Sequence, residues 1–358
     1  YYAIRDKKTA AFLRSLAYMV GALLLALMVN ASVLWSTAEY AGDSIRGKSN
    51  LTKNTNEPHT GVTRDYAYEF SQGVGETLTF LAPDAYGGST SNPGDADSKV
   101  VTVLTDRGAN VGQAQNIAQH LPMYWGDKTF TEGPWYFGAI ICFLFIFGIM
   151  VVKNRLKWWL IATVVLTMLL SFGKNFPYVS DLFFNYFPLY NKFRAVESIL
   201  TITSLCFPIL AFLAIDEVIK ESNKQLVFKK LKIALYITGG LLLILLAVPE
   251  TLLSFRSSNH GEFVSWLTQA IGGDSGTANA IAGGLIQDRE AAARADALRS
   301  LIFVLLTFGL IWAYTKQKIK VTVFSVGLLV LVLADLWSVD KRYLNNDSFV
   351  NKDDVQKP

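Results

Sequence analysis

Long apolar segments are the feature of this sequence that most limits its possible folds. Seven mostly apolar blocks recur along the 358 residues. About 20 helical residues cross a hydrocarbon core of about 30 Å, and blocks near that length are typical of membrane spans. Charged residues make up 17% of the chain, against about 25% in soluble domains. The sequence therefore predicts an all-α polytopic membrane protein with about seven transmembrane helices and long loops.

These blocks divide the chain into membrane and loop segments. The predicted spans are Phe12–Ser36, Pro134–Val152, Trp158–Phe172, Ser198–Ile215, Ile233–Phe255, Ser300–Thr315 and Val321–Trp337. The segments are 1–36 (cytoplasmic start and first span), 37–133 (outer loop), 134–337 (six-helix bundle with outer loops at 173–197 and 256–299) and 338–358 (outer tail). Since the chain starts at Tyr and ends in polar residues, we expect a piece of a longer protein, with another outer domain after the tail.

Positive charge in the short connections predicts the orientation. Lys and Arg concentrate near the start of the chain and in the segments 153–157, 220–232 and 316–320. All four segments fall on one side of a seven-span arrangement, and short loops rich in Lys and Arg stay in the cytoplasm. The long loops and the tail are therefore expected to be extracytoplasmic.

Several function classes have little support. The net charge is only +4 and forms no basic surface, so nucleic-acid binding is not expected. Cys142 and Cys206 lie inside apolar blocks, where cysteine behaves as a small hydrophobe. The three histidines lack ligand spacing, and no phosphate-binding or dinucleotide motif occurs. No cofactor is identified, and a requirement for a divalent metal stays open.

Aromatic, acidic and basic residues meet in the predicted outer loops. Sugars stack on aromatic rings and bind carboxylates, whereas phosphates attract Arg and Lys. The candidate contacts to a sugar or an acceptor are Glu39, Tyr40, Glu76, Tyr124 and Trp125. The candidate ligands of a phosphate are Arg46, Lys174, Lys192 and Arg194. The alternative is that these cations only extend toward lipid headgroups.

Further expectations concern the loops and the span ends. Segments 37–133 and 173–197 share aromatic and charged residues, so we expect them to form one cavity over the spans. The apolar stretch Thr77–Ala82 is expected to pack on the spans, and Gly276–Arg299 to be a helix that runs into the sixth span. Glu250 and Asp335 lie near the outer ends of spans. Each has two possible interpretations, as part of an exposed helix end or as a functional group.

A family resemblance is carried by the aromatic loop that begins at Lys174 and ends in Phe-Pro-Leu-Tyr-Asn-Lys-Phe-Arg at residues 187–194. The sequence there resembles the YfhO-like bacterial membrane proteins, relatives of the GT-C class of polyprenyl-phosphate-dependent glycosyltransferases, in a style like that of Bacteroidetes members. Other agreeing motifs are Glu39-Tyr40, Ser44–Gly47, Gly75–Thr77, Tyr86–Gly88, Tyr124–Gly126, Glu132–Pro134, Asp335–Trp337 and Lys341–Leu344.

This resemblance implies a GT-C-like fold in the bacterial cytoplasmic (inner) membrane. The implied reaction is transfer of a sugar from a polyprenyl-phosphate carrier to a cell-envelope glycan or polymer outside the cytoplasm. The expected partners are membrane lipids, the lipid-linked sugar, the acceptor and other envelope proteins. In GT-C enzymes the usual catalytic Asp lies in the first outer loop, which would precede residue 1, so no catalytic residue is assigned.

Two other functions stay open. One is a transporter or flippase of lipid-linked substrates, although the sequence lacks the internal repeat typical of many transporters. The other is a non-catalytic membrane subunit of an envelope assembly. Within the glycosyltransferase hypothesis, Arg194 with Lys192, and with Lys174 and Arg46, is expected to bind the carrier phosphate, because a guanidinium at headgroup depth can make two hydrogen bonds to it.

Overall fold

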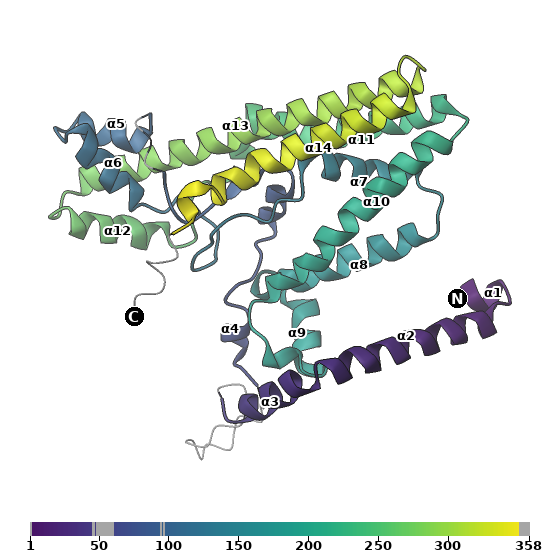
Figure 1. Ribbon diagram of the computed structural model, residues 1–358. Helices are drawn as coiled ribbons and strands as arrows, with labels where there is room; N and C mark the ends of the chain where they lie inside the picture. Colours follow the sequence, from purple (N-terminus) through teal and green to yellow (C-terminus); the bar gives the residue numbers. More distant parts are fainter. Residues whose placement is uncertain (1, 45–46, 48–60, 94, 96, 351–358) are drawn as a thin grey trace. The chain divides into compact units, whose positions relative to one another are not determined.

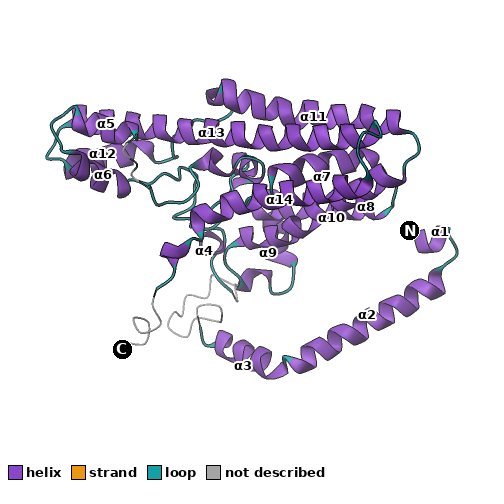
Figure 2. Cartoon of the chain, turned by 45° about the horizontal axis from the view of Figure 1, so that its top comes forward, coloured by secondary structure: helices purple, strands orange, loops and turns teal. Residues whose placement is uncertain are grey.

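The fold is helical throughout the part of the chain that the structure describes. The computed structural model describes residues 2–44, 47, 61–93, 95 and 97–350. These residues contain helices and loops and no strand, as Figure 2 shows, which confirms the predicted all-α fold. The chain forms two compact units, one made of residues 1–67 with 183–194 and the other of residues 68–182 with 195–358.

The first unit contains a long apolar helix. Its elements are α1 (Tyr2–Arg5), α2 (Thr9–Val29), α3 (Ala31–Gly42), α4 (Arg64–Ala67), η4 (Tyr190–Lys192) and the end of α9 (Pro177–Tyr186). The predicted span Phe12–Ser36 is divided at Asn30, whose backbone leaves helical geometry. Asparagine favours such breaks, and here its side-chain amide donates to the carbonyl of Ala26 at 2.9 Å. The 21 residues of α2 remain long enough to cross a membrane.

The second unit is a helix bundle with loops at one end. Its long helices are α7 (Ala139–Val151), α8 (Leu156–Ser171), α10 (Leu200–Lys220), α11 (Lys224–Ala247), α13 (Ser275–Thr315) and α14 (Val321–Tyr343). Its shorter elements are η1 (Gly75–Phe80), η2 (Pro83–Tyr86), α5 (Lys99–Thr105), α6 (Val111–Gln119), η3 (Gly173–Asn175), the start of α9, η5 (Val196–Ile199), η6 (Pro249–Thr251), α12 (His260–Ala270) and η7 (Asn346–Ser348).

Five helices of the described residues are long and apolar enough to cross a membrane. They are α2, α10 with η5, α11, α13 and α14, and two shorter apolar helices, α7 and α8, occupy the second and third predicted spans. Helix α7 starts at Ala139 rather than at Pro134 because the preceding residues bind the segment that carries η1 (Gly75–Phe80). The amide of Phe137 donates to the carbonyl of Phe80 at 3.2 Å.

Helix α7 lies at the centre of the bundle. Ten of its 13 residues are buried, as expected for a helix that is apolar on all sides. It packs closely on α10, where a Cβ atom at Gly148 would lie 2.9 Å from Leu210. Glycine at this position therefore lets the two backbones approach.

Helix α13 extends beyond the bundle. Its 41 residues span roughly 62 Å, about twice the thickness of a hydrocarbon core. The N-terminal half lies beside α5, α6 and α12, as Figure 1 shows. These helices share a second apolar core that includes Val100, Ala114 and Ile281. The helix predicted over Gly276–Arg299 is thus confirmed as the first half of α13.

The segment that carries η1 and η2 is inserted into the bundle. Phe80, Leu81 and Ala82 are buried in the main apolar core. Non-helical backbone that is buried among apolar helices needs hydrogen-bond partners inside the protein, and here the helices supply them. The Ser300 hydroxyl donates to the carbonyl of Leu81 at 2.7 Å, and the Cys142 thiol lies 3.2 Å from the carbonyl of Phe80. The predicted packing of Thr77–Ala82 on the spans is confirmed.

The basic connections gather at one end of this bundle. Lys153, before α8, pairs with Glu221 at the end of α10. Lys224, at the start of α11, donates to the carbonyl of Val218 at 2.7 Å and lies over the ring of Tyr314 near the end of α13. The three connections that the orientation argument used therefore share one end of the second unit.

Candidate functional site

A polar cavity lies among the loops at the other ends of these helices. Its volume is about 410 Å³, within the range of about 300–1,000 Å³ typical of small-molecule sites. The lining residues are Gly73, Val74, Gly75, Glu76, Tyr86, Trp125, Gly126, Asp127, Asn175, Ser254, Arg256 and Ser258. They come from segments 73–86, 125–127 and 254–258 and from Asn175. Within the second unit, parts of loops 37–133 and 173–197 therefore meet at this cavity, as expected, whereas residues 37–67 and 183–194 of these loops belong to the first unit.

Two stacked aromatic rings form one wall of the cavity. The rings of Tyr86 and Trp125 lie 3.9 Å apart and nearly parallel, and Phe255 contacts Trp125 at 5.7 Å between ring centroids. Gly75 allows the tyrosine to approach the loop, because a Cβ atom there would lie 2.1 Å from the Tyr86 hydroxyl. Burial, with smaller effects from Glu76 and Asp127, raises the pKa of Tyr86 to about 12. Its hydroxyl therefore remains a hydrogen-bond donor at neutral pH.

A buried charge network supports the floor of the cavity. The Lys128 ammonium lies 3.2 Å from Glu76 Oε2 and 2.6 Å from Glu197 Oε2, and donates to Gln72 Oε1 at 3.0 Å. The ammonium charge is thus balanced by two carboxylates, and one of its donors binds a neutral amide oxygen. Lys128 and Glu197 lie in the two loops that were expected to meet, so this network joins those loops.

Glu76 is held from several sides. Its Oε1 accepts from the hydroxyl of Tyr124 at 3.0 Å and from the amide of Gly73 at 3.1 Å, and its side chain is only 3% exposed. Burial raises the pKa of Glu76, while the charge of Lys128 and its hydrogen bonds lower it. Both carboxylate oxygens already have protein partners, so Glu76 is suited to shaping the cavity more than to abstracting a proton.

Arg289 binds the backbone of the segments that carry the aromatic wall of the cavity. This residue of α13 is 4% exposed and donates to three backbone carbonyls, those of Pro122 at 2.7 Å, Met123 at 2.9 Å and Phe255 at 3.0 Å. The first two precede Trp125 in the sequence, and the third precedes Arg256. A single guanidinium therefore joins the two segments that present Trp125 and Arg256.

The structure brings together part of the predicted set. Glu76 and Trp125 line the cavity, Tyr124 binds Glu76, and the Lys174 ammonium donates to the carbonyl of Asp127 at 3.2 Å. The other predicted residues lie elsewhere.

Four of them belong to the first unit, which is described by itself. Glu39 and Tyr40 are exposed on α3. Lys192 is part of η4, and the Arg194 guanidinium lies 4.8 Å from the ring centroid of Tyr66 and donates to its hydroxyl at 3.3 Å. Arg46 falls outside the described residues. The role expected of these cations with a phosphate stays a prediction.

Sequence reasoning missed Lys128, Arg256 and Arg289. Lys128 was one charged residue among many in a long loop, and only burial distinguishes it. Arg289 lies in an alanine-rich helix whose sequence predicts packing on small residues, and its partners are as far as 167 positions away. Arg289 is one of three arginines in this part of the helix, with Arg294 and Arg299, and no local pattern distinguishes it as the buried one.

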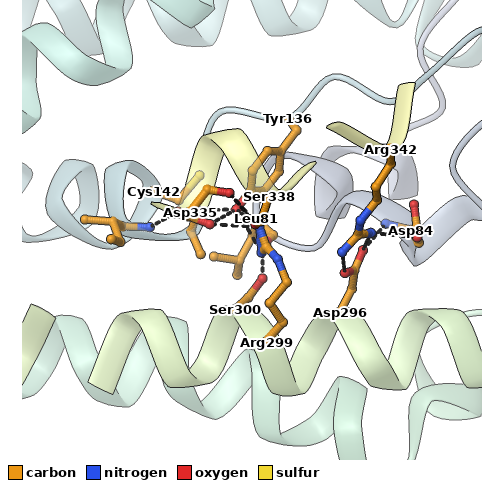
Figure 3. Close-up of polar contacts among 12 residues, drawn as sticks. Leu81, Asp84, Tyr136, Cys142, Asp296, Arg299, Ser300, Asp335, Ser338 and Arg342 are labelled. Atoms are coloured by element: carbon orange, nitrogen blue, oxygen red, sulfur yellow. Dashed lines mark hydrogen bonds and ion pairs between the residues drawn. The ribbon is translucent and has the colours of Figure 1, made fainter. Parts of the chain in front are cut away.

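A second polar network lies inside the bundle (Figure 3). Asp335 of α14 is 1% exposed and pairs with Arg299 of α13 at 2.9 Å. It also accepts from the Tyr136 hydroxyl and from the amide of Ile140 at 3.2 Å. The reading of Asp335 as an exposed helix end was wrong, because α14 turns it toward the start of α7. Glu250 does lie at an exposed position, paired with Arg294 at 3.2 Å.

A third network joins the inserted segment to α13 and α14. Arg342 lies 2.8 Å from Asp84 Oδ2 and 2.7 Å from Asp296 Oδ1, as Figure 3 shows. The Tyr343 hydroxyl donates to the other Asp84 oxygen at 2.9 Å. Asp84 and Arg342 line a larger cavity of about 660 Å³, but these contacts occupy both groups. We therefore regard the smaller cavity, with its aromatic wall, as the better candidate.

An apolar groove of about 360 Å³ begins next to the candidate site. Thr77, Phe80 and Leu81 line it, and Thr77 directly follows Glu76 of the polar cavity. The other walls come from α7, α8, α10 and α11. Element η1 thus contributes to both the polar cavity and the apolar groove.

Comparisons with known proteins identified no relative of this chain. A scan of family models, a search of curated proteins and a search of solved structures each gave no match. Among the residues that the structure describes, no three His, Cys, Asp or Glu side chains group in a way that could hold a metal ion.

Proposed function

We propose that this chain is part of a membrane glycosyltransferase of the GT-C type, which moves a sugar from a polyprenyl-phosphate carrier to a cell-envelope acceptor. The observation that supports this most is the polar cavity at the loop end of the bundle, where the stacked Tyr86 and Trp125 rings face a carboxylate-bearing loop. An aromatic platform with a few convergent polar groups suits a saccharide.

The adjoining groove supports a lipid-linked donor. A polyprenyl phosphate sugar has an apolar chain and a polar head, and η1 separates an apolar groove from a polar cavity by one residue, between Thr77 and Glu76. In this proposal the isoprenoid chain lies along α7 and α8 and the sugar lies in the polar cavity, beside the wall that Tyr86 and Trp125 form.

The residues of the cavity would bind and orient the donor. Loss of the sugar leaves negative charge on the carrier phosphate, and cations near the cavity would stabilise it. Proton removal from the acceptor needs a free carboxylate. Asp127 is exposed and lines the cavity, whereas both oxygens of Glu76 are occupied. We assign no catalytic base to this chain.

The proposal includes a topology. Helices α7 and α8 would join the five longer helices as membrane spans, giving the seven of the sequence-based prediction. The basic end of the bundle would face the cytoplasm and the cavity would face outward from a bacterial cytoplasmic membrane, since Lys-rich connections resist translocation.

A binding subunit without catalysis is the second candidate. The occupied oxygens of Glu76 favour it, because they leave the most buried carboxylate of the cavity without a free site. The two candidates share saccharide binding and differ in whether transfer follows.

Binding of lipid-linked sugars tests the proposal. The chain would be reconstituted in nanodiscs and titrated with polyprenyl-phosphate hexoses and with sugar-free polyprenyl phosphate. We expect the sugar to increase affinity, and Tyr86→Ala or Trp125→Ala to remove that increase, whereas Trp266→Ala on the exposed face of α12 should retain it. Equal affinity of the wild-type chain for the carrier with and without every sugar tested would contradict the proposal.

A further inference from the structure

Two hydrogen-bond donors of the polar cavity lack protein partners. The indole N–H of Trp125 is buried, with the residue 5% exposed, and has no acceptor among the described residues. The guanidinium of Arg256 is exposed at the cavity, and within the described part of the chain no side-chain hydrogen bond or ion pair of this residue occurs. Both groups can donate and neither can accept.

A buried donor without an acceptor costs free energy, so such a group points to something that binds there. An acceptor with negative charge satisfies both donors, because hydrogen bonds to an ionised acceptor are about twice as strong as neutral ones. Arg in particular presents a planar fork that matches the oxygens of a phosphate.

The charges around the cavity agree with an anion at this end of it. Arg289 lies behind the wall and binds carbonyls rather than a carboxylate. Burial lowers the pKa of His260, at the start of α12, and Arg256 and Arg289 lower it further, so both cations act on this region. Two carboxylates line the cavity as well, but Glu76 is paired with Lys128, and Asp127 follows Trp125 at an exposed position.

We infer that Arg256 and the indole N–H of Trp125 bind the oxygens of a phosphate ester at the polar cavity. This inference rests on the proposed function, since the phosphate would belong to the ligand whose sugar contacts the aromatic wall. It assigns the phosphate to residues other than the predicted cations of the first unit. The same chemistry fits a soluble phosphate ester and the headgroup of a lipid phosphate.

Phosphate probes without sugar separate this inference from the proposed function. The wild-type chain in phosphatidylcholine nanodiscs would be titrated with methyl phosphate and with polyprenyl phosphate, followed by ³¹P NMR. The variants are Arg256→Gln, Arg256→Lys and Trp125→Phe. The last of these keeps an aromatic ring but loses the indole N–H. The matched controls are Arg107→Gln and Trp266→Phe, at exposed positions outside the cavity.

We expect at least one probe to bind to the wild-type chain. Arg256→Gln should lower the affinity for that probe about tenfold, and Arg256→Lys and Trp125→Phe should lower it by smaller factors. The controls should bind as the wild type does. Binding of polyprenyl phosphate alone would identify a lipid headgroup, and binding of both probes would show that the phosphate suffices. The inference is overturned if neither probe binds, or if Arg256→Gln and Trp125→Phe both bind like the wild type. If the sugar still increases the affinity for the carrier when the phosphate test fails, the proposed function is retained and only this inference is rejected.

Discussion

Asp335 on α14 accepts a hydrogen bond from the backbone amide of Ile140, at the start of α7, over 3.2 Å. The first amides of a helix have no partner within the helix, and a side chain usually caps them locally. Here Gly138 precedes α7 and supplies no side-chain cap. The carboxylate of another helix takes that role, and its charge is balanced by Arg299.

Asp335→Asn should therefore destabilise the bundle strongly. The change leaves Arg299 without its anion in a mostly buried position, and breaking a buried pair in this way costs about 3–5 kcal/mol. The free energy of unfolding in detergent micelles would measure the effect. Asp340→Asn, at an exposed position of the same helix, should change it by less than about 0.5 kcal/mol. Equal stability of the two variants would show that the pair has no structural role.

The charge network below the cavity predicts a pH effect. Burial raises the pKa of Glu76 above the ordinary 4.5, and Lys128 opposes this rise. Because the folded state holds the Glu76 proton more tightly than the unfolded chain, the contribution of this group to stability is full below pH 4.5 and declines as the pH rises through its folded-state pKa.

Lys128→Met removes the opposing charge, so the pKa of Glu76 should rise further and the loss of stability should extend to higher pH. Melting temperatures measured from about pH 4.5 to 8 would show a steeper decline than in the wild type. The double variant Lys128→Met with Glu76→Gln should flatten the profile again, since Gln does not titrate. A Lys128→Met profile parallel to that of the wild type would argue against this network.

Arg289 should act as a positioning residue for the cavity. Lys in its place keeps the charge and loses the fork that reaches three carbonyls. We expect amide exchange at Met123 and Trp125 to accelerate by roughly tenfold or more, which corresponds to about 1.4 kcal/mol of local stability. Arg294→Lys on the same helix, whose partners are Glu250, Glu290 and the end of α11, should leave exchange at these two amides unchanged. Exchange at wild-type rates in Arg289→Lys would contradict the role.

The orientation can be tested by labelling. Lys229 is exposed near the start of α11, and the native Cys142 and Cys206 are buried. A cysteine at Lys229 should resist a membrane-impermeant maleimide in intact cells and react after permeabilisation, whereas a cysteine at exposed Ser91 should react in both. The opposite pattern would reverse the topology.

The membrane helices could be predicted because their signal is local. A run of apolar residues such as Leu241–Leu246 indicates a span without knowledge of any partner, and the inserted stretch Thr77–Ala82 was visible in the same way. Boundaries were harder, because the start of α7 depends on a hydrogen bond from Phe137 to the distant Phe80.

The candidate site was predictable only in part. Glu76 and Trp125 were found because carboxylates and aromatic residues concentrate in the predicted outer loops. Arg289 was not, since its partner Met123 lies 166 positions away and no local pattern encodes that contact. For Asp335 the sequence left two interpretations open for a similar reason: its position near a helix end was clear, but the side that it faces depends on how α14 packs against α7 and α13.

Photo-crosslinking would test the central claim most directly. A polyprenyl-phosphate sugar with a diazirine on the sugar would be added to the chain in nanodiscs, irradiated and mapped by mass spectrometry. The account predicts crosslinks in residues 73–76, 125–127 and 254–258, reduced by an excess of unlabelled donor and by Trp125→Ala. Competable crosslinks confined to other segments, such as 89–93 of the larger cavity or 187–194 of the first unit, would contradict it.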